Sequence, residues 1–385
     1  MKIRVRNSCA DYKTYRAARV KSLFNVESGA DFALDADIPV DDDGWSVGVV
    51  VGPSGSGKTS VGRKLFGGGA FYDGSEWDGG KPIVDCISPE GSFDDVTAAL
   101  SAVGLGSVPT WLRPYHVLSN GEKFRADLAR IISEAPARVV IDEFTSVVDR
   151  QIAKIGALAF QKSWRRTGGQ AVLLSCHYDV LEWLEPDWIF DTSTGNFERA
   201  EAGRRLRRRP KIELEIRETN GSYWPMFEPH HYLKLPRMVA CRYFVGFVDG
   251  EPVAHLGVSP RLDVSGVRAC RMVIMPEWQG AGVGTRFLNY LMEREVTGGG
   301  RFGARVKRGY FHTSHPGLCA ALRRDKKWVQ VSSSLFGGDK AKSGASIAKS
   351  RAGKPAFGSG YGGHFRAVQG FKYLGEAYAA GKVAS

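Results

Sequence analysis

Hydrophobic and polar positions in the first half of the chain alternate between short apolar runs and stretches of helical periodicity. The first strand-like alternation is KIRVRN, at the start of the chain. Apolar runs predict further strands, and spacings of three and four residues predict helices between them. The strands are expected at 46–52, 82–87, 138–144 and 171–177, and the helices at 92–103, 121–134 and 150–166. Short apolar strands separated by helices are typical of a parallel sheet covered on both faces.

The second half shows a different pattern. CRYFVGFVDGEPVAHLGVSP, residues 241–260, predicts two strands joined by an Asp-Gly turn. Further strands are expected at 267–276, 309–315, 327–332 and 364–376, and helices at 285–296 and 316–325. Residues 337–363 are rich in Gly, Ser and Lys and are expected to form a loop. This part is therefore predicted to be a mixed α/β domain.

A basic run, RRLRRRPK, separates the two halves, and six of its eight residues are Lys or Arg. Such a charged run containing a Pro favours a linker. We predict a first domain over residues 1–203, a linker over 204–211 and a second domain over 212–385.

Composition narrows the class of protein. No apolar run approaches the ~18 residues that a membrane helix needs, and no secretory leader opens the chain, so a cytoplasmic protein without a membrane partner is expected. Six cysteines without a CxxC pair favour reduced thiols.

The net charge of +12 is unevenly distributed along the chain. Residues 1–200 carry 22 Lys and Arg against 27 Asp and Glu, whereas residues 201–385 carry 31 against 14. The excess favours an acidic partner for the second half, either nucleic acid or a phosphorylated cofactor. A generally basic surface kept for solubility is the alternative.

The strand at 46–52 leads into GPSGSGKTS, which matches the pattern G-x-x-x-x-G-K-[ST]. Glycines let successive backbone N–H groups turn towards phosphates, Lys58 reaches the outer phosphates, and the Thr59 hydroxyl ligates Mg²⁺. We expect an ATP site made by Gly52, Ser54, Gly55, Gly57, Lys58, Thr59 and Ser60.

Two carboxylates end the strand at 138–144. Asp142 is placed to hold the magnesium ion through water, and Glu143 is placed to polarise the attacking water. The metal ligands are therefore expected to be Thr59 and Asp142.

Four motifs follow the P-loop in a fixed order: LSNGE at 118–122, the Asp-Glu pair, Ser146–Asp149, and a lone histidine ending LLSCH. This order resembles the ABC-type ATPases over about residues 1–200. The resemblance implies a head-to-tail homodimer in which Ser119 and Gly121 contact the ATP held by a second copy. It also implies that Asp149 is the D-loop aspartate and that His177 senses the γ-phosphate. Without these motifs, a histidine at a strand end is more often a structural residue.

The chain departs from the transporter ATPases of this family. Ser119 lies only 61 positions after Lys58, so a reduced helical subdomain is expected. SPEG follows the strand predicted at 82–87, with no Q-loop glutamine, which argues against a transporter subunit. Phe24 and Phe32 are candidates for stacking on adenine, or for core positions.

A second glycine motif, QGAGVG at 279–284, follows a strand and opens a helix. Alone it would also suit a dinucleotide fold, but with a Pro three residues earlier it resembles the acyl-CoA loop of GNAT acyltransferases, over roughly 212–376. The resemblance implies that backbone N–H groups and the helix N-terminus bind the diphosphate of acetyl-CoA or another acyl-CoA. It also implies that the preceding strand splays from its neighbour and polarises the thioester carbonyl. The expected cofactor-binding residues are Ile274, Gln279, Gly280, Ala281, Gly282, Val283, Gly284 and Thr285.

The general base of this second site is not evident, because the strand before the loop carries arginines where the family often has a carboxylate. The stretch GYFHTSHPG supplies the catalytic candidates Tyr310, Ser314 and His315, since His acts as a base near neutral pH and Tyr as an acid. FEPHHYL, at 227–233, offers a second cluster near the expected acceptor. A structural role for either cluster, or a metal at the paired histidines, is the alternative.

These patterns together predict an α/β protein: a P-loop ABC-type nucleotide-binding domain followed by a mixed α/β GNAT acyltransferase domain. ATP, Mg²⁺ and acyl-CoA are the expected cofactors. The predicted function is ATP-gated acyl transfer to an amine, with DNA as the expected partner, by distant resemblance to DNA-modifying GNAT proteins of the phage Mom type. The alternatives are a DNA-binding ATPase with a recognition module, or acylation of a protein or small amine.

Overall fold

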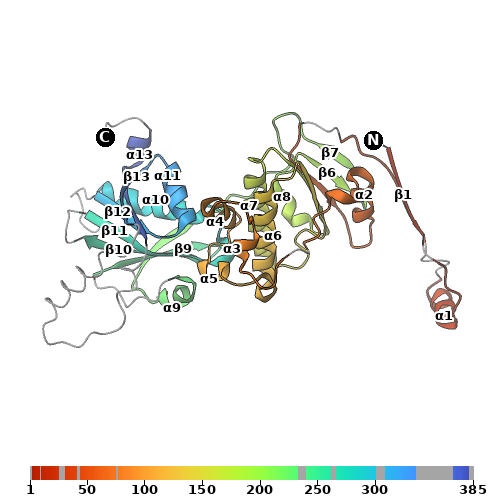
Figure 1. The fold of residues 1–385 in the computed structure, drawn as a ribbon, viewed down its shortest axis with the longest axis horizontal. Helices are drawn as coiled ribbons and strands as arrows, with labels where there is room; N and C mark the ends of the chain where they lie inside the picture. The colour runs from red at the N-terminus through yellow and green to blue at the C-terminus, as the bar shows by residue number, and fades with distance from the viewer. Residues whose placement is uncertain are drawn as a thin grey trace. The chain divides into compact units, whose positions relative to one another are not determined.

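The computed structural model describes residues 2–8, 10–25, 31–40, 44–74, 77–232, 240–261, 266–300, 308–334 and 367–380. The chain forms two compact units (Figure 1). Unit 1 contains residues 1–77 and 134–210, and unit 2 contains residues 78–133 and 211–385. Residues 78–133, which we call the helical insert, thus belong to the same unit as the second half. The loop predicted at 337–363 lies outside the described residues.

Unit 1 is built on a five-stranded sheet with the order β4-β5-β3-β6-β7. The first four strands are parallel, and β7 is antiparallel to β6. These strands are β3 (Val47–Val51), β4 (Arg138–Ile141), β5 (Gln170–Ser175), β6 (Trp188–Asp191) and β7 (Phe197–Arg199). The strands expected at 46–52, 138–144 and 171–177 are therefore confirmed. Buried valines and leucines on both faces explain why these runs do not alternate with polar residues.

Two helices and a pair of antiparallel strands pack with the sheet of unit 1. These are α2 (Lys58–Phe66), α7 (Arg150–Trp164) and the antiparallel pair β1 (Lys2–Ser8) with β2 (Asp31–Asp37). Ile3 of β1 packs into a cluster with Trp45, Val61 and Trp188, and the Trp45 and Trp188 rings meet edge to face at 5.4 Å. Helix α1 (Tyr15–Phe24) buries no residue, and Phe24 is 72% exposed.

The helical insert contains α3 (Ile83–Cys86), α4 (Phe93–Ala102), α5 (Val108–Trp111) and α6 (Asn120–Glu134). The prediction of a strand at 82–87 was wrong, because this segment contains the helix α3. Ile83, Cys86 and Ile87 are the buried positions, and spacings of three and four residues are those of one helix face. Pro82 precedes the helix in an extended conformation, as expected at a helix start.

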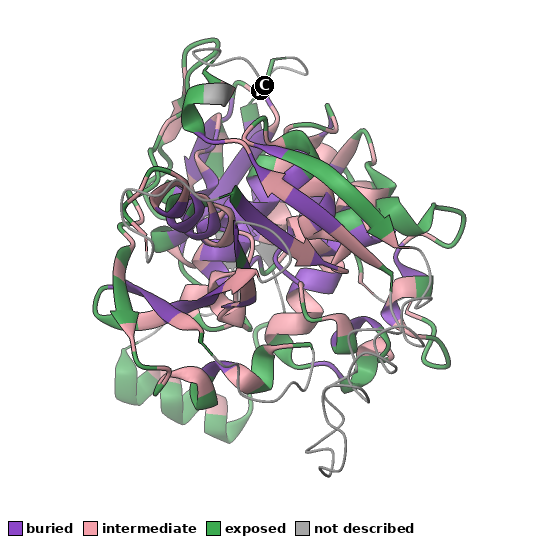
Figure 2. Ribbon diagram, turned by 90° about the vertical axis from the view of Figure 1, so that its left-hand side faces the viewer, coloured by how far each residue is buried: buried purple, intermediate pink, exposed green. Residues whose placement is uncertain are grey.

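The remainder of unit 2 is a seven-stranded sheet with the order β13-β14-β12-β11-β10-β9-β8. Its strands are β8 (Glu215–Thr219), β9 (Arg242–Val248), β10 (Glu251–Arg261), β11 (Gly266–Ile274), β12 (Arg308–Thr313), β13 (Trp328–Ser334) and β14 (Val368–Tyr373). The predicted hairpin is confirmed: Asp249 and Gly250 both have positive φ, at 50° and 82°, which a tight Asp-Gly turn requires. Purple segments in Figure 2 mark the buried strands at the centre of this sheet.

Strands β11 and β12 form the only parallel pair among the described strands of this sheet, and they separate towards their C-terminal ends. Their register runs only from Gly266 opposite Arg308 to Ala269 opposite Phe311. Helix α10 (Val283–Val296) follows β11, and α11 (Pro316–Arg324) follows β12. The short helices α9 (Trp224–Phe227) and α13 (Glu376–Ala379) lie near the two ends of this part of the chain. The splayed pair that the sequence led us to expect is therefore present, and both units are α/β.

Candidate functional site

The P-loop of unit 1 joins β3 to the N-terminus of α2. Gly55 and Gly57 take φ values of 79° and 83°, which L side chains rarely adopt, and a Cβ on Gly55 would meet no atom within 4 Å. Lys58 is 7% exposed, and its ammonium donates to the carbonyl oxygens of Gly52 and Pro53, at 2.9 and 2.8 Å. The first N–H groups of a helix have no acceptor within it, so this loop is suited to an anion. The residues fit the phosphates of ATP.

Asp142 and Glu143 directly follow β4 at the same sheet edge as the P-loop, because β3, β4 and β5 are parallel. The Asp142 carboxylate accepts the backbone N–H of Glu143 at 2.9 Å. Glu143 has a φ of 50° and accepts a hydrogen bond from the Ser146 hydroxyl at 2.5 Å. An exposed carboxylate held by a hydroxyl at this edge is suited to orienting water, and the hydroxyl of Thr59 and the carboxylate of Asp142 are oxygen groups of the kind that Mg²⁺ prefers.

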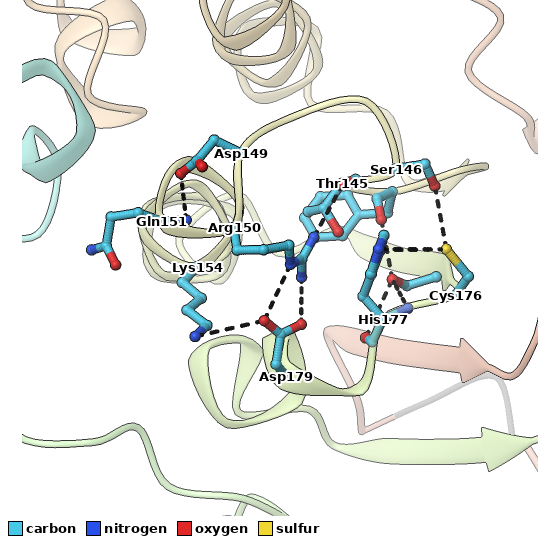
Figure 3. Close-up of polar contacts among 11 residues, drawn as sticks. Thr145, Ser146, Asp149, Arg150, Gln151, Lys154, Cys176, His177 and Asp179 are labelled. Carbon is cyan, nitrogen blue, oxygen red and sulfur yellow. Dashed lines mark hydrogen bonds and ion pairs between the residues drawn. The ribbon is translucent and has the colours of Figure 1, made fainter.

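The segment after Glu143 is tied to the residues that follow β5 (Figure 3). Arg150 donates to the backbone oxygen of Thr145 at 3.3 Å and forms an ion pair with Asp179, which Lys154 also approaches at 3.6 Å. The Asp149 carboxylate accepts the N–H of Gln151 at 2.8 Å and caps α7. Asp149 thus has a structural partner of its own in this conformation.

His177 lies two residues beyond β5, with its Nδ1 3.3 Å from the Cys176 sulfur. Burial, together with the positive charge of Arg150, lowers the pKa of His177 below its ordinary value. The ring is therefore neutral near pH 7, with one nitrogen available as a donor.

The signature sequence in the helical insert forms a capping box at the start of α6. The Glu122 carboxylate accepts both the backbone N–H and the hydroxyl of Ser119, each at 2.9 Å, and Ser119 accepts the Glu122 N–H at 3.4 Å. Burial raises the pKa of Glu122, but hydrogen bonds from Ser119 and Thr110 outweigh it and hold the pKa below its ordinary value. Ser119 is exposed, and Gly121 lies in the first turn.

The second glycine loop lies between β11 and α10. Gly280 and Gly282 have φ values of 92° and 78°, and a Cβ on Gly282 would meet no atom within 4 Å. A Cβ on Gly284 would lie 2.8 Å from the Met272 side chain, so Gly284 lets α10 pack closely on β11. Gln279 donates to the carbonyl oxygen of Ile274 at 2.9 Å and closes the loop. Ala281 and Val283 are buried and Thr285 is partly buried in the first turn of α10. The loop fits a diphosphate above the start of α10.

The three predicted catalytic residues of this unit, Tyr310, Ser314 and His315, have separate surroundings in the structure and do not form one cluster. Tyr310 is 8% exposed in the paired part of β12, with the Arg261 guanidinium over its ring. The Ser314 hydroxyl donates to the carbonyl oxygen of Ala367. His315 caps α11: its Nδ1 accepts the Leu318 N–H at 3.3 Å, so Nε2 carries the proton and donates to the Gly106 oxygen at 3.1 Å. Burial lowers the pKa of His315, and the ring is neutral.

Sequence reasoning missed an aromatic cluster beneath β10 and β11. The His255 side chain is fully buried within 5.0–5.7 Å of the Trp224, Phe227 and Tyr243 rings, and burial lowers its pKa to about 4. Arg271, at a bulge with a φ of 51°, places its guanidinium over Trp224. The alternation of apolar and polar residues along β11 places Arg271 on the buried face of the strand, but no pattern in the sequence indicates that its guanidinium lies over Trp224.

His231 also contacts this cluster, 5.6 Å from the Trp224 ring. Within the described residues, no group of three or more His, Cys, Asp or Glu is arranged to hold a metal ion. In the same part of the chain, no helix is both long and apolar enough to cross a bilayer.

Known proteins resemble both halves of the chain. The acetyltransferase (GNAT) family matches residues 210–301. A cytochrome c biogenesis ATP-binding export protein, CcmA, of Rhodospirillum rubrum is 31% identical over 163 residues, which are 34% of this chain and 68% of that protein. The protein of the same name from Pseudomonas fluorescens is 31% identical over 180 residues, 38% of this chain and 82% of its own length.

Among solved structures, the ATP-binding cassette MJ0796 in a dimeric post-hydrolysis state with ADP and phosphate is similar over 52% of this chain and 98% of its own. Its sequence identity is 14% and its TM-score is 0.36. The two sequence relatives show the ATPase family, and the family match at residues 210–301 shows the acyltransferase domain. The chain belongs to the ABC-type ATPases and carries, in its second half, an acyltransferase domain of the GNAT family.

Proposed function

We propose that the protein uses ATP to control the transfer of an acyl group from acetyl-CoA to an amine of a nucleic-acid base. One observation carries the proposal: a single chain holds a P-loop at the edge of a parallel sheet and a second glycine loop beside the splayed strands β11 and β12. ATP, Mg²⁺ and an acyl-CoA are the cofactors that the two families imply. Acetyl-CoA as the donor and DNA as the acceptor are our proposals, as is a cytoplasmic location.

The proposed ATP cycle uses a head-to-tail homodimer. Lys58 and the P-loop bind the phosphates, Thr59 and Asp142 hold Mg²⁺, and Glu143 orients water for attack on the γ-phosphate. Ser119 and Gly121 of the second copy complete the site, and the neutral His177 donates to the γ-phosphate. The hydrogen bond from Ser146 supports the role of Glu143, because it keeps the carboxylate in one orientation.

The proposed transfer takes place where β11 leaves β12. The loop from Gln279 to Thr285 binds the diphosphate, and free backbone N–H groups of β11 polarise the thioester carbonyl. The amine nitrogen forms a bond to the carbonyl carbon, the carbon–sulfur bond breaks, and the amine proton passes to a base as CoA leaves as a thiolate. Tyr310, Ser314 and His315 remain the predicted catalytic residues.

A nucleic-acid acceptor is supported by charge. Residues 201–385 carry 31 Lys and Arg against 14 Asp and Glu, and such a surface attracts phosphates. A base amine must leave the duplex to react, which a closing ATPase dimer would assist. Six of these basic residues lie in the proposed linker at 204–211, and most of the others lie in the proposed acyltransferase domain that begins at residue 212.

Mass spectrometry of nucleosides tests the proposal. DNA from cells that express the protein is expected to contain an acylated nucleoside, which is missing with either Lys58→Ala or Gly282→Val. Unmodified nucleosides in all three cultures, with each protein present at equal level, would refute acylation of DNA.

A second candidate function is an ATPase clamp whose acyltransferase-like part only recognises DNA. It is favoured by β11, which carries Arg268 and Arg271 and no carboxylate. This alternative predicts ATP-dependent retention of DNA without any binding of acetyl-CoA, which calorimetry with the full chain decides.

A further inference from the structure

Residues 104–106 of the helical insert, which we call the strap, lie against the glycine loop of the acyltransferase part. The Gly106 N–H donates to the Gln279 side-chain oxygen at 3.0 Å. A Cβ built on Gly104 would lie 2.1 Å from the carbonyl oxygen of Gln279 and 3.1 Å from the nitrogen of Gly280. The strap therefore approaches the first N–H donors of the loop more closely than any side chain would allow.

The strap also contacts the segment that follows β12, the second of the two strands that separate. The carbonyl oxygen of Gly106 accepts a hydrogen bond from Nε2 of His315, which directly precedes α11 in the short connection from β12. Because Gln279 follows β11 and His315 follows β12, Gly106 bridges the two strands at the end where they separate. The Trp111 ring lies 5.5 Å from the His315 ring and donates to the carbonyl oxygen of Leu105 at 2.7 Å, which fixes the strap from behind.

Neighbouring helices pack together around the strap. Helices α4 and α11 lie side by side (Figure 1). A Cβ on Gly317 would lie 2.1 Å from the Ser101 hydroxyl, so this helix contact is also close. The strap is thus one end of a packed surface between the helical insert and the acyltransferase part.

Arg125 of α6 fastens the strap to the loop. One guanidinium nitrogen donates to the carbonyl oxygens of both Gly104 and Pro276, at 2.5 and 2.6 Å. The side chain is 4% exposed, and its Nε and second terminal nitrogen have no hydrogen-bond partner among the described residues. Burial lowers the pKa of Arg125 to about 10, so it remains charged at neutral pH. A buried cation with two unpartnered nitrogens is costly, which favours a conformation in which these nitrogens find other acceptors.

We propose that the strap is a gate over the acyl-CoA entrance, held closed by Arg125, and that it must leave the loop before acyl-CoA binds. The proposal rests on the proposed function, because it regulates the same acyl-CoA site. The diphosphate needs the N–H groups that begin at Gly280, and the pantetheine needs the opening that Gly106 bridges. A closed gate lowers the apparent affinity by the fraction of open molecules.

Helix α6 links the gate to ATP. Ser119 caps this helix, and Arg125 lies six residues further on, about 9 Å along the axis. When ATP bound by the second copy contacts Ser119 and displaces α6, Arg125 moves with the helix and its hydrogen bonds to the strap and the glycine loop change. ATP binding and acyl-CoA binding are then coupled, and each strengthens the other by the same factor.

Calorimetry of acetyl-CoA binding to the full chain tests the gate. Gly104→Ala adds a methyl group that collides with the Gln279 backbone only when the strap is docked, and Arg125→Met removes the fastening. Both variants are expected to bind acetyl-CoA about tenfold more tightly than the wild type. Matched controls are Gly250→Ala, which has the same φ of 82° in open space, and Arg113→Met, an exposed arginine of the same insert; neither is expected to change the affinity.

Equal or weaker binding in Gly104→Ala and Arg125→Met, with melting curves that show both folded, would overturn the gate and leave a purely structural contact. If neither the wild type nor any variant binds acetyl-CoA, the proposed function fails and the gate with it. In a second arm, ATP is added to Glu143→Gln protein, with and without Gly104→Ala. ATP is expected to strengthen acetyl-CoA binding only when Gly104 is intact, and no effect of ATP would overturn the link through α6.

Discussion

At the scale of single residues, short motifs were predictable from the sequence because their chemistry is local. The P-loop and the QGAGVG loop each open a helix as expected, since their glycines take positive φ values at fixed positions. Arg125 is 4% exposed, although a charged side chain is usually found on the exposed face of a helix. Spacings of seven and three residues place Arg125 on the same helix face as the buried Leu118 and Leu128, but its charge gave no sign of this burial in the sequence.

The acyl-CoA loop gives a prediction at this scale. Gly282→Val is expected to weaken acetyl-CoA binding about 10- to 100-fold, because the loss of one or two charge-assisted backbone hydrogen bonds costs about 1.5–3 kcal/mol. ATP hydrolysis is expected to be unchanged. Calorimetry and a phosphate-release assay measure the two, with Gly250→Val as a control for backbone strain at an open site. Unaltered acetyl-CoA affinity in Gly282→Val would remove the loop from the binding site.

At the scale of elements, strands and helices with a long, regular pattern were predicted well. Strands β3, β4 and β5 and helices α4, α6 and α7 form where the sequence placed them. The segment at 82–87 was assigned the wrong type because a short apolar run does not distinguish a strand from one helical turn. The contact between the strap and the glycine loop joins residues 173 apart in sequence, and no local pattern signals it.

The signature helix α6 gives the prediction at this scale. Ser119→Arg and Lys58→Ala proteins are each expected to be almost inactive as ATPases. A mixture of the two is expected to recover activity, because the mixed dimer contains one site with both an intact P-loop and an intact signature. Phosphate release is measured for each protein and for the mixture. Activity in the mixture no greater than the mean of the parents would exclude action of Ser119 on the second copy's ATP.

At the scale of the whole chain, the pattern of strands and helices predicted two α/β parts but not which segments of the chain pack into each compact unit. The helical insert is continuous in sequence with the ATPase motifs, yet it forms one compact unit with the acyltransferase part. The order of motifs along the chain could be read from the sequence. The division into compact units could not, because it depends on packing between segments that are distant in sequence, such as α4 and α11. The charge asymmetry is also a property of the whole chain.

Salt dependence gives the prediction at this scale. DNA binding is expected to weaken about 10³-fold or more between 50 and 200 mM salt if roughly six phosphates are neutralised. Fluorescence anisotropy with labelled duplex DNA measures the slope for the full chain. Replacing three arginines of the 204–211 run by Gln is expected to reduce that slope. Equal retention of DNA at both salt concentrations would contradict an electrostatic interface in the second half.

Transfer of labelled acetyl groups to DNA tests directly whether ATP controls acyl transfer. Purified wild-type protein is incubated with duplex DNA and radiolabelled acetyl-CoA, with and without ATP and Mg²⁺, beside Lys58→Ala protein. We expect label in the DNA only for the wild type with ATP. Equal labelling without ATP or with Lys58→Ala would contradict control by ATP, and label in none of the reactions would contradict acyl transfer to DNA.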